Sequence, residues 1–176
     1  MIGNREQAML YIMGLPDDAI VEVKEWKPKR SNKQNSYYWV LATQIANVMR
    51  MSKTVVHNLL LRDYGQPIFI GGEKHYSLIP DTDKAEKDVL NQEEYHLKPT
   101  GFVRDHNGKM YRAYSSILGS KFYNTQEMSI LLDGCIQEAK SVGIETLTPN
   151  EIARMRQEDE AIEARRRKKR DTTGVQ

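Results

Sequence analysis

The spacing of apolar and polar residues predicts a helix and then a strand at the start of the chain. A helix is expected from Asn4 to Met13, because Asn4 and Gln7 form a capping box and Gly14 follows the last turn. Apolar and polar residues then alternate from Ile20 to Trp26, which predicts a half-buried strand. Pro28 is expected to end that strand.

A longer helix is predicted from Asn32 to Arg50, after a second capping box formed by Ser31 and Gln34. Its apolar residues recur at intervals of three and four positions, so they share one inward face. The residues of this face are Tyr38, Leu41, Ile45 and Val48. Ser52 is expected to cap a shorter helix that ends near Gly65.

The middle of the chain changes to a pattern typical of β-hairpins. Gly71–Gly72 separates two short apolar segments within residues 68–79, and Asn107–Gly108 separates two segments within residues 101–117. Both pairs of residues favour the tight turns of hairpins. The stretch from Pro80 to Lys98 is more polar and is expected to connect the two hairpins, with its acidic residues in solvent.

Two further helices are expected in the last third of the chain. Thr125 is the predicted cap of an amphipathic helix from Gln126 to Val142. Thr148 and Glu151 form another capping box, with a proline in the first turn. From Glu158 onward this last helix is almost wholly charged and is expected to project into solvent. The predicted fold is therefore α+β, with two hairpins in a small mixed sheet that packs against several helices.

The charge distribution divides the chain into a domain and a tail. Of its 26 basic residues, six are consecutive at positions 165–170, which leaves 20 basic against 24 acidic residues elsewhere. We therefore expect an α+β domain over residues 1–155 and a charged, basic tail over residues 156–176. Such a tail is typical of an arm that binds a polyanion, although a solvated end or an import signal has the same composition.

The cysteine content and hydropathy predict a cytoplasmic protein. Cys135 is the single cysteine, so an intramolecular disulfide is excluded and a reducing compartment is expected. Its position on the inward face of the predicted helix favours a role as a small core residue. No apolar run approaches the roughly 18 residues that cross a bilayer, so neither a membrane span nor a signal peptide is expected.

The residues that could support catalysis form no compact pattern. The four histidines lack the short spacings of metal sites, and no glycine loop for phosphate is present, so no cofactor is expected. A metal-dependent endonuclease or junction resolvase is retained as an alternative, because Asp105 and His106 lie at a hairpin turn. Asp81 and Asp83 would supply further carboxylates in that interpretation.

The densest polar chemistry lies at the start of the long helix. Free N–H groups and the positive end of a helix dipole attract phosphate, and four nearby basic residues strengthen the positive electrostatic field. Just beyond them, Trp39 is either a core residue or an exposed ring that stacks on a base. The candidate nucleic-acid-binding residues are Lys27, Lys29, Arg30, Ser31, Lys33, Gln34, Asn35 and Trp39, together with Arg165, Arg166, Arg167, Lys168, Lys169 and Arg170.

The same segment resembles a known family. Arg30-Ser31-x-x-Gln34-Asn35 followed by Trp39 is similar to the Arg-Ser-x-x-Gln-Asn segment and tryptophan of the NinB or Orf recombination mediators of lambdoid phages. The Leu-Pro-Asp turn at residues 15–17 and the helices around Gly143–Ile144 resemble that family as well. The resemblance covers roughly residues 4–50 and 117–152, and the extra hairpin sequence and longer basic tail depart from it.

The resemblance implies a homodimer that binds single-stranded DNA, contacts single-strand-binding protein and helps a recombinase load onto covered strands, without catalysing a reaction. By matching position, Gln34 and Trp39 would contact the DNA, and Arg30, Ser31 and Asn35 would shape the helix start. Beside this mediator and the endonuclease, a third interpretation is a protein-binding adaptor with buried aromatics and solvated bases.

Overall fold

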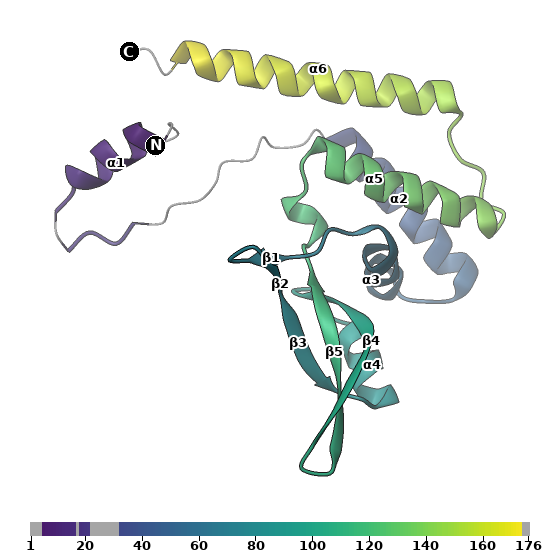
Figure 1. Ribbon diagram of the computed structural model, residues 1–176. Helices are drawn as coiled ribbons and strands as arrows, with labels where there is room; N and C mark the ends of the chain where they lie inside the picture. Colours follow the sequence, from purple (N-terminus) through teal and green to yellow (C-terminus); the bar gives the residue numbers. More distant parts are fainter. Residues whose placement is uncertain (1–4, 17, 22–31, 174–176) are drawn as a thin grey trace.

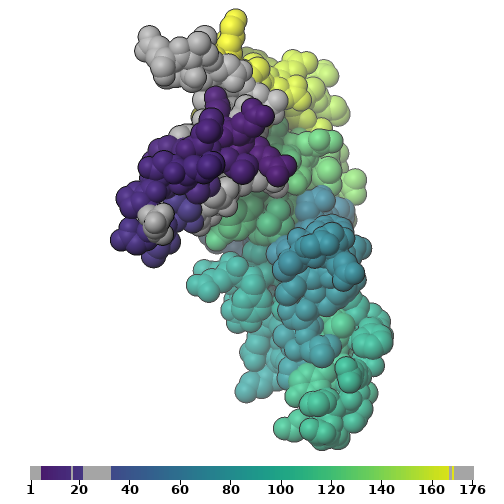
Figure 2. Space-filling model, turned by 60° about the vertical axis from the view of Figure 1, so that its left-hand side comes forward, coloured from purple at the N-terminus to yellow at the C-terminus, as the bar shows by residue number. Residues whose placement is uncertain are grey.

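The computed structural model describes residues 5–16, 18–21 and 32–173, and it has the predicted α+β fold (Figure 1). In Figures 1 and 2, helices make up the upper part of the molecule, and the sheet with α4 makes up the lower part. The elements are α1 (Arg5–Met13), α2 (Asn32–Met49), α3 (Lys53–Tyr64), β1 (Phe69–Ile70), β2 (Glu73–Lys74), β3 (Tyr76–Pro80), α4 (Asp83–Leu90), β4 (His96–His106), β5 (Lys109–Ile117), the 3₁₀ helix η1 (Ser120–Phe122), α5 (Thr125–Ser141) and α6 (Pro149–Thr173).

The main core lies between α2, α3 and α5. Of the predicted inward face of α2, three residues are buried, but Val48 is 55% exposed. The buried face passes instead through Ala42 and Ala46, which are small enough to let α5 approach closely. On α5, Cys135 is fully buried, and burial raises the pKa of its thiol to about 12, so it is the expected core residue.

The predicted helix starts are confirmed to within one residue. The Ser52 hydroxyl accepts the N–H of Val55 at 3.2 Å, as expected for the cap of α3. The cap of α5 is Asn124 and not Thr125, because Asn124 forms a reciprocal capping box with Glu127. Thr125 lies inside the helix, and its hydroxyl donates to Glu163 of α6 at 2.5 Å.

Both predicted hairpins are present, but they belong to different sheets. β1 and β2 form one antiparallel pair around Gly71–Gly72, whereas β3, β5 and β4 form a three-stranded sheet in that order. The expectation of a single mixed sheet is wrong, because β3 leaves the first hairpin and pairs antiparallel with β5. The second turn has positive φ at Asn107 (54°) and Gly108 (74°), as its sequence predicts.

The polar stretch between the hairpins contains the unpredicted helix α4. Thr82 caps it by accepting the N–H of Ala85 at 3.2 Å. Val89 is its buried residue, and it packs with Leu97 and Tyr114 against the sheet. One apolar contact in eight residues gives too short a pattern to predict a helix.

The first segment of the chain is confirmed only in part. The predicted helix appears as α1, which has no buried residue. Ile20 and Val21 form no strand, and Ile20 is fully exposed. The rest of the predicted strand, residues 22–26, lies outside the described residues.

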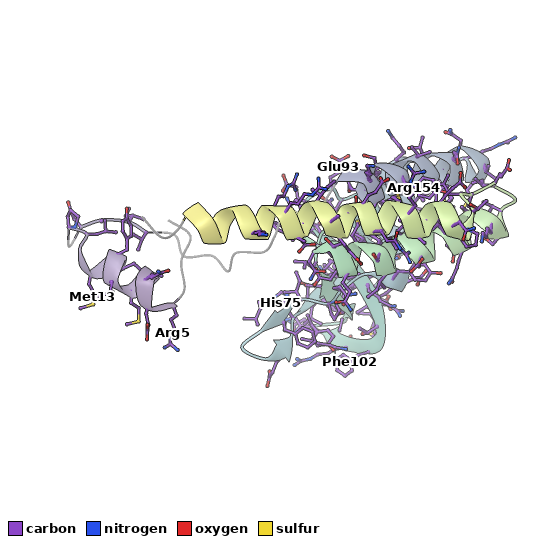
Figure 3. The ribbon with its side chains drawn as sticks, turned by 90° about the horizontal axis from the view of Figure 1, so that it is seen from above. Arg5, Met13, His75, Glu93, Phe102 and Arg154 are labelled. Carbon is purple, nitrogen blue, oxygen red and sulfur yellow. The ribbon has the colours of Figure 1, made fainter. Side chains whose placement is uncertain are left out.

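More of the last helix packs against the domain than its charged sequence suggests. α6 runs without a break across the predicted boundary at residues 155 and 156. Asp159 and Glu163 are 1% and 8% exposed, so the helix does not project from Glu158 onward, and the expectation holds only for its last turns (Figure 3). Figure 3 shows α6 lying over α2 and α5, with its last turns extending beyond these two helices.

A polar cluster ties α4 to α3 and the sheet, and it makes stability depend on pH. Glu86 accepts hydrogen bonds from Arg62 and, at 2.5 Å, from the Tyr114 hydroxyl. Burial opposes ionisation of Glu86, but these donors outweigh it and hold its pKa below the ordinary value of 4.5. A depressed pKa gives stability that is present above the ordinary value and is lost as the pH falls through the folded-state value.

We therefore expect the urea midpoint of unfolding to fall on acidification from about pH 5 to about pH 3. Glu86→Gln is expected to show a shallower fall over the same range, because the amide cannot be protonated there. Urea titrations at a series of pH values measure this difference. Equal slopes for the two proteins would contradict the assignment to Glu86.

Candidate nucleic-acid interface

The start of α2, where the sequence places a phosphate site, is covered by α6. Lys33 forms an ion pair with Glu158, and the Asp159 carboxylate accepts the N–H of Gln34 at 3.2 Å. Gln34 is 1% exposed, and its side-chain oxygen accepts the Ser129 hydroxyl at 2.8 Å. The expectation that Gln34 contacts DNA is therefore wrong, because its hydrogen bonds are made inside the protein.

The other residues predicted at this helix start are placed only in part. Asn35 is half-buried, and its side-chain oxygen is buried without a hydrogen-bond partner among the described residues. Lys33 is exposed, although its charge is opposed by Glu158. Four predicted residues lie outside the described part of the chain: Lys27, Lys29, Arg30 and Ser31.

The basic segment predicted as a tail forms the last turns of α6. Arg165, Arg166 and Lys168 are exposed on this helix. The side chains of Arg167, Lys169 and Arg170 lie outside the described ones. The structure thus presents at least part of the basic segment on a helical surface.

Trp39 lies at the surface, so the alternative that places it in the core is not supported. It is 36% exposed, whereas its neighbour Tyr38 is fully buried. One side of the indole packs on His57, with ring centroids 4.7 Å apart and planes inclined by 37°. The edge of Tyr38 also contacts it, at 5.3 Å between centroids. These contacts hold the ring in place while part of it stays accessible.

A pocket of about 360 Å³ opens beside Trp39. This volume lies within the range of about 300 to 1,000 Å³ that is typical of small-molecule sites. The pocket lies where α2 and α3 meet the segments before β4 and after β5, so its wall combines distant parts of the sequence. Its lining residues are Trp39, Lys53, Thr54, His57, Gln92, Glu93, His96, Gly119, Ser120 and Lys121.

Two histidines in the wall are held by hydrogen bonds from behind. The Tyr38 hydroxyl lies 2.6 Å from Nδ1 of His57, and the side-chain oxygen of Asn58 lies 2.6 Å from Nδ1 of His96. The Asn58 amide donates to the carbonyls of Leu90 and Gln92, which fixes its oxygen toward His96. His96 therefore donates from Nδ1, and in its neutral form Nε2 is an acceptor.

The charges around the pocket favour an anionic ligand that also carries a flat ring. Lys53 and Lys121 are exposed at its wall, whereas Glu93 accepts the Thr54 hydroxyl at 3.2 Å. Burial and the Lys121 charge lower the pKa of His96, so this ring is neutral near pH 7. The pocket thus offers an indole to stack on, a neutral imidazole and two ammonium groups beside one carboxylate.

Glycine at position 119 keeps this pocket open. A side-chain carbon added there would lie 3.2 Å from Nε2 of His96, which is closer than most carbon contacts in proteins. Sequence reasoning identified Trp39 but missed His57, His96, Lys53 and Lys121. These four residues are spread over three segments, and no spacing signal connects them.

The acids proposed for an endonuclease do not converge. Asp81 binds Arg112 at 2.8 Å, and Asp105 accepts the N–H of Gly108 at 3.3 Å in the hairpin turn. Asp83 lies in the first turn of α4. Within the part of the chain that the structure describes, no three histidine, cysteine or acidic side chains are grouped so that they could hold a metal ion.

Among residues 5–16, 18–21 and 32–173, no helix has both the length and the apolar character needed to cross a membrane. No protein-family model, curated protein sequence or solved structure matches the chain.

Proposed function

We propose that this protein binds single-stranded DNA without catalysing a reaction, and that the pocket beside Trp39 receives a base. The observation that carries the proposal is an accessible indole, fixed by its contacts with His57, in a pocket that also presents Lys53 and Lys121. Proteins that bind single strands combine such aromatic rings, which stack on nucleobases, with basic side chains that follow the phosphates. The helix start of α2 has no part in this proposal.

The energetics of the pocket suit a ligand of this class. Stacking of one base on an aromatic ring contributes about 1 to 3 kcal/mol, and every base has a flat face, so the interaction tolerates any sequence. Lys53 and Lys121 would each release counterions from a bound phosphate, which makes affinity fall with salt. Weak sequence preference and strong salt dependence are therefore the expected properties.

The basic end of α6 would act as an electrostatic arm in the same complex. Arg165, Arg166 and Lys168 are exposed near the end of the helix, where they can attract a strand without reading its sequence. The biological role proposed with this activity is that of a phage recombination mediator. In that role a homodimer would assist recombinase loading on strands covered by single-strand-binding protein, as the sequence resemblance implies.

Trp39→Leu is expected to weaken binding of a labelled single strand about tenfold, because leucine fills space but cannot stack on a base. Fluorescence anisotropy at low salt measures the affinity. Phe69→Leu, which removes an aromatic ring that is 56% exposed on β1, is the matched control and should have no effect. Equal affinities for Trp39→Leu and the wild type would refute the pocket as the binding site.

The charged part of the pocket is tested separately. Lys53→Ala with Lys121→Ala is expected to reduce the slope of log affinity against log salt by about 1.4, at roughly 0.7 for each lost phosphate contact. Strand cleavage on addition of magnesium would replace the proposal with the endonuclease alternative. Absence of binding at low salt, with retained binding to a replication protein, would favour the adaptor.

A further inference from the structure

The three-stranded sheet has one covered face and one open face. Side chains alternate between the two faces along each strand, and the register fixes which residues share a face. Ile79, Leu97 and Tyr114 pack with Val89 of α4, so they mark the covered face. The residues that alternate with them lie on the other face, and three of these are buried where the sheet meets the helices or the neighbouring strands: His96, Ala113 and Ile117. The remaining residues of this face form the open face, which comprises Tyr76, Leu78 and Pro80 of β3, Lys98, Arg104 and His106 of β4, and Lys109, Tyr111 and Ser115 of β5.

The open face presents aromatic and aliphatic side chains to solvent, although Tyr111 is half-buried. Tyr76 and Leu78 are 52% and 53% exposed, and His106 is exposed as well. The rings of His106 and Tyr111 are perpendicular neighbours, with centroids 6.4 Å apart and planes inclined by 71°. Leu78, Arg104, His106 and Tyr111 line a hollow of about 330 Å³ on this face.

The two faces of the sheet differ in the carboxylates they carry. The open face carries Lys98, Arg104 and Lys109, all exposed, and its nine residues include no carboxylate. Carboxylates gather on the other side, where Glu86 of α4 binds Arg62 and Asp81 binds Arg112. The open face is therefore cationic as well as aromatic.

A surface that is both cationic and aromatic fits a strand of nucleic acid better than it fits the same face of a second copy of the chain. Bases can stack on the tyrosines while phosphates contact the three cations. A second copy of the chain would bring three cations against three identical ones, which is unfavourable in a two-fold interface. Charge complementarity thus selects a polyanion as the occupant.

We propose that the open face of the sheet is a second binding surface for single-stranded DNA, separate from the pocket beside Trp39. Tyr76 and Tyr111 would stack on bases, and Lys98, Arg104 and Lys109 would bind the phosphates. The ligand class rests on the proposed function, but the residues are different, so the two sites can be tested independently.

The first test removes two cations from the open face. Lys98→Ala with Arg104→Ala is expected to weaken binding of a labelled strand of roughly 16 nucleotides about tenfold at low salt. The salt slope should fall by about 1.4, at roughly 0.7 for each lost phosphate contact. Lys84→Ala with Lys87→Ala removes the same charge from exposed positions of α4, beside the covered face, and should leave affinity within about twofold.

The second test removes a ring while the charge stays constant. Tyr76→Leu is expected to weaken strand binding about fivefold with an unchanged salt slope, because stacking is lost and phosphate contacts remain. Circular dichroism and urea unfolding of each variant show whether it folds like the wild type. A folded double cation variant with wild-type affinity and slope would overturn the proposal.

The outcomes separate this proposal from the one for the pocket. Loss of affinity in the open-face variants with none in Trp39→Leu would support the open face and refute the pocket. The reverse pattern would refute the open face alone, and absence of strand binding by the wild-type protein would refute both. If light scattering shows that Tyr76→Leu splits a dimer while strand affinity is unchanged, the occupant is a second copy and the proposal fails.

Discussion

Replacement of Gly134 by alanine is expected to lower the free energy of unfolding by about 2 kcal/mol, which is about a thirtyfold change in the unfolding equilibrium constant. Gly134 lies in α5 beneath the ring of Tyr64, and an added side-chain carbon would lie 2.2 Å from Cγ of that ring. Alanine favours a helix over glycine by about 1 kcal/mol, but overpacking outweighs this gain.

The ring of Tyr64 cannot move aside without further loss. The nearest atoms are Cγ, Cδ2 and Cδ1, at the end of the ring next to the backbone, and the hydroxyl at the other end donates to Glu138 at 2.7 Å. Urea denaturation measures the expected loss of stability. Gly101→Ala is the matched control, because an added carbon there meets no atom within 4 Å. If the clash is the cause, Tyr64→Ala should cancel most of the additional cost of Gly134→Ala in a double-mutant cycle.

Local chemistry made the element boundaries predictable. Ser52 caps α3, and the side chain of Glu151 accepts hydrogen bonds from the N–H and hydroxyl of Thr148, as their sequence patterns indicate. The Asn107–Gly108 turn is predictable for the same reason, since these residues tolerate positive φ. Each of these signals involves residues within three positions of one another, so a single sequence is enough to identify it.

The path of α6 could not be predicted from its own composition. A run of charges normally faces solvent, yet Asp159 and Glu163 are buried, because the start of α2 and Thr125 of α5 supply their hydrogen-bond donors. Those donors lie far away in the sequence. The same contacts explain why the predicted phosphate site at the start of α2 is closed.

The pocket was predictable only through Trp39. Its other lining residues come from α3, from residues 92–96 at the start of β4 and from residues 119–121 after β5. Their proximity therefore depends on long-range packing. His57 and His96 lie 39 positions apart in the sequence, a spacing that no motif records, and only the fold brings their ring centroids to 5.4 Å. Isolated histidines and lysines carry no signal of such a site in one sequence.

Asp159→Ala is expected to lower the free energy of unfolding by about 1 to 2 kcal/mol, the effect typical of losing a helix cap. The Asp159 carboxylate accepts the N–H of Gln34, one of the first groups of α2 that has no partner within its own helix. Its other oxygen is buried without a hydrogen-bond partner among the described residues. Asp159→Asn keeps an acceptor for Gln34 and removes the buried charge, so it is expected to be much less destabilising than alanine.

The alanine and asparagine substitutions also separate the effect of the hydrogen bond to Gln34 from the effect of the Asp159 charge. Burial raises the pKa of Asp159 above its ordinary value of 3.8, although the N–H of Gln34 opposes the shift. With a raised pKa the folded state binds the proton more tightly, so the contribution of Asp159 to stability increases as the pH falls through the folded-state value. This sign is opposite to that of Glu86, and Asp159→Asn should abolish it in urea titrations against pH.

Removal of the two α6 carboxylates that contact the start of α2 also tests what covers this helix start. In Glu158→Ala with Asp159→Ala, a strand affinity above that of the wild type would identify this helix start as a phosphate site closed by α6, since carboxylates and phosphates bind the same N–H groups. An unchanged affinity would leave Asp159 as a structural cap. Glu160→Ala with Glu145→Ala, at two exposed positions, removes the same charge elsewhere and controls for the general field of the protein.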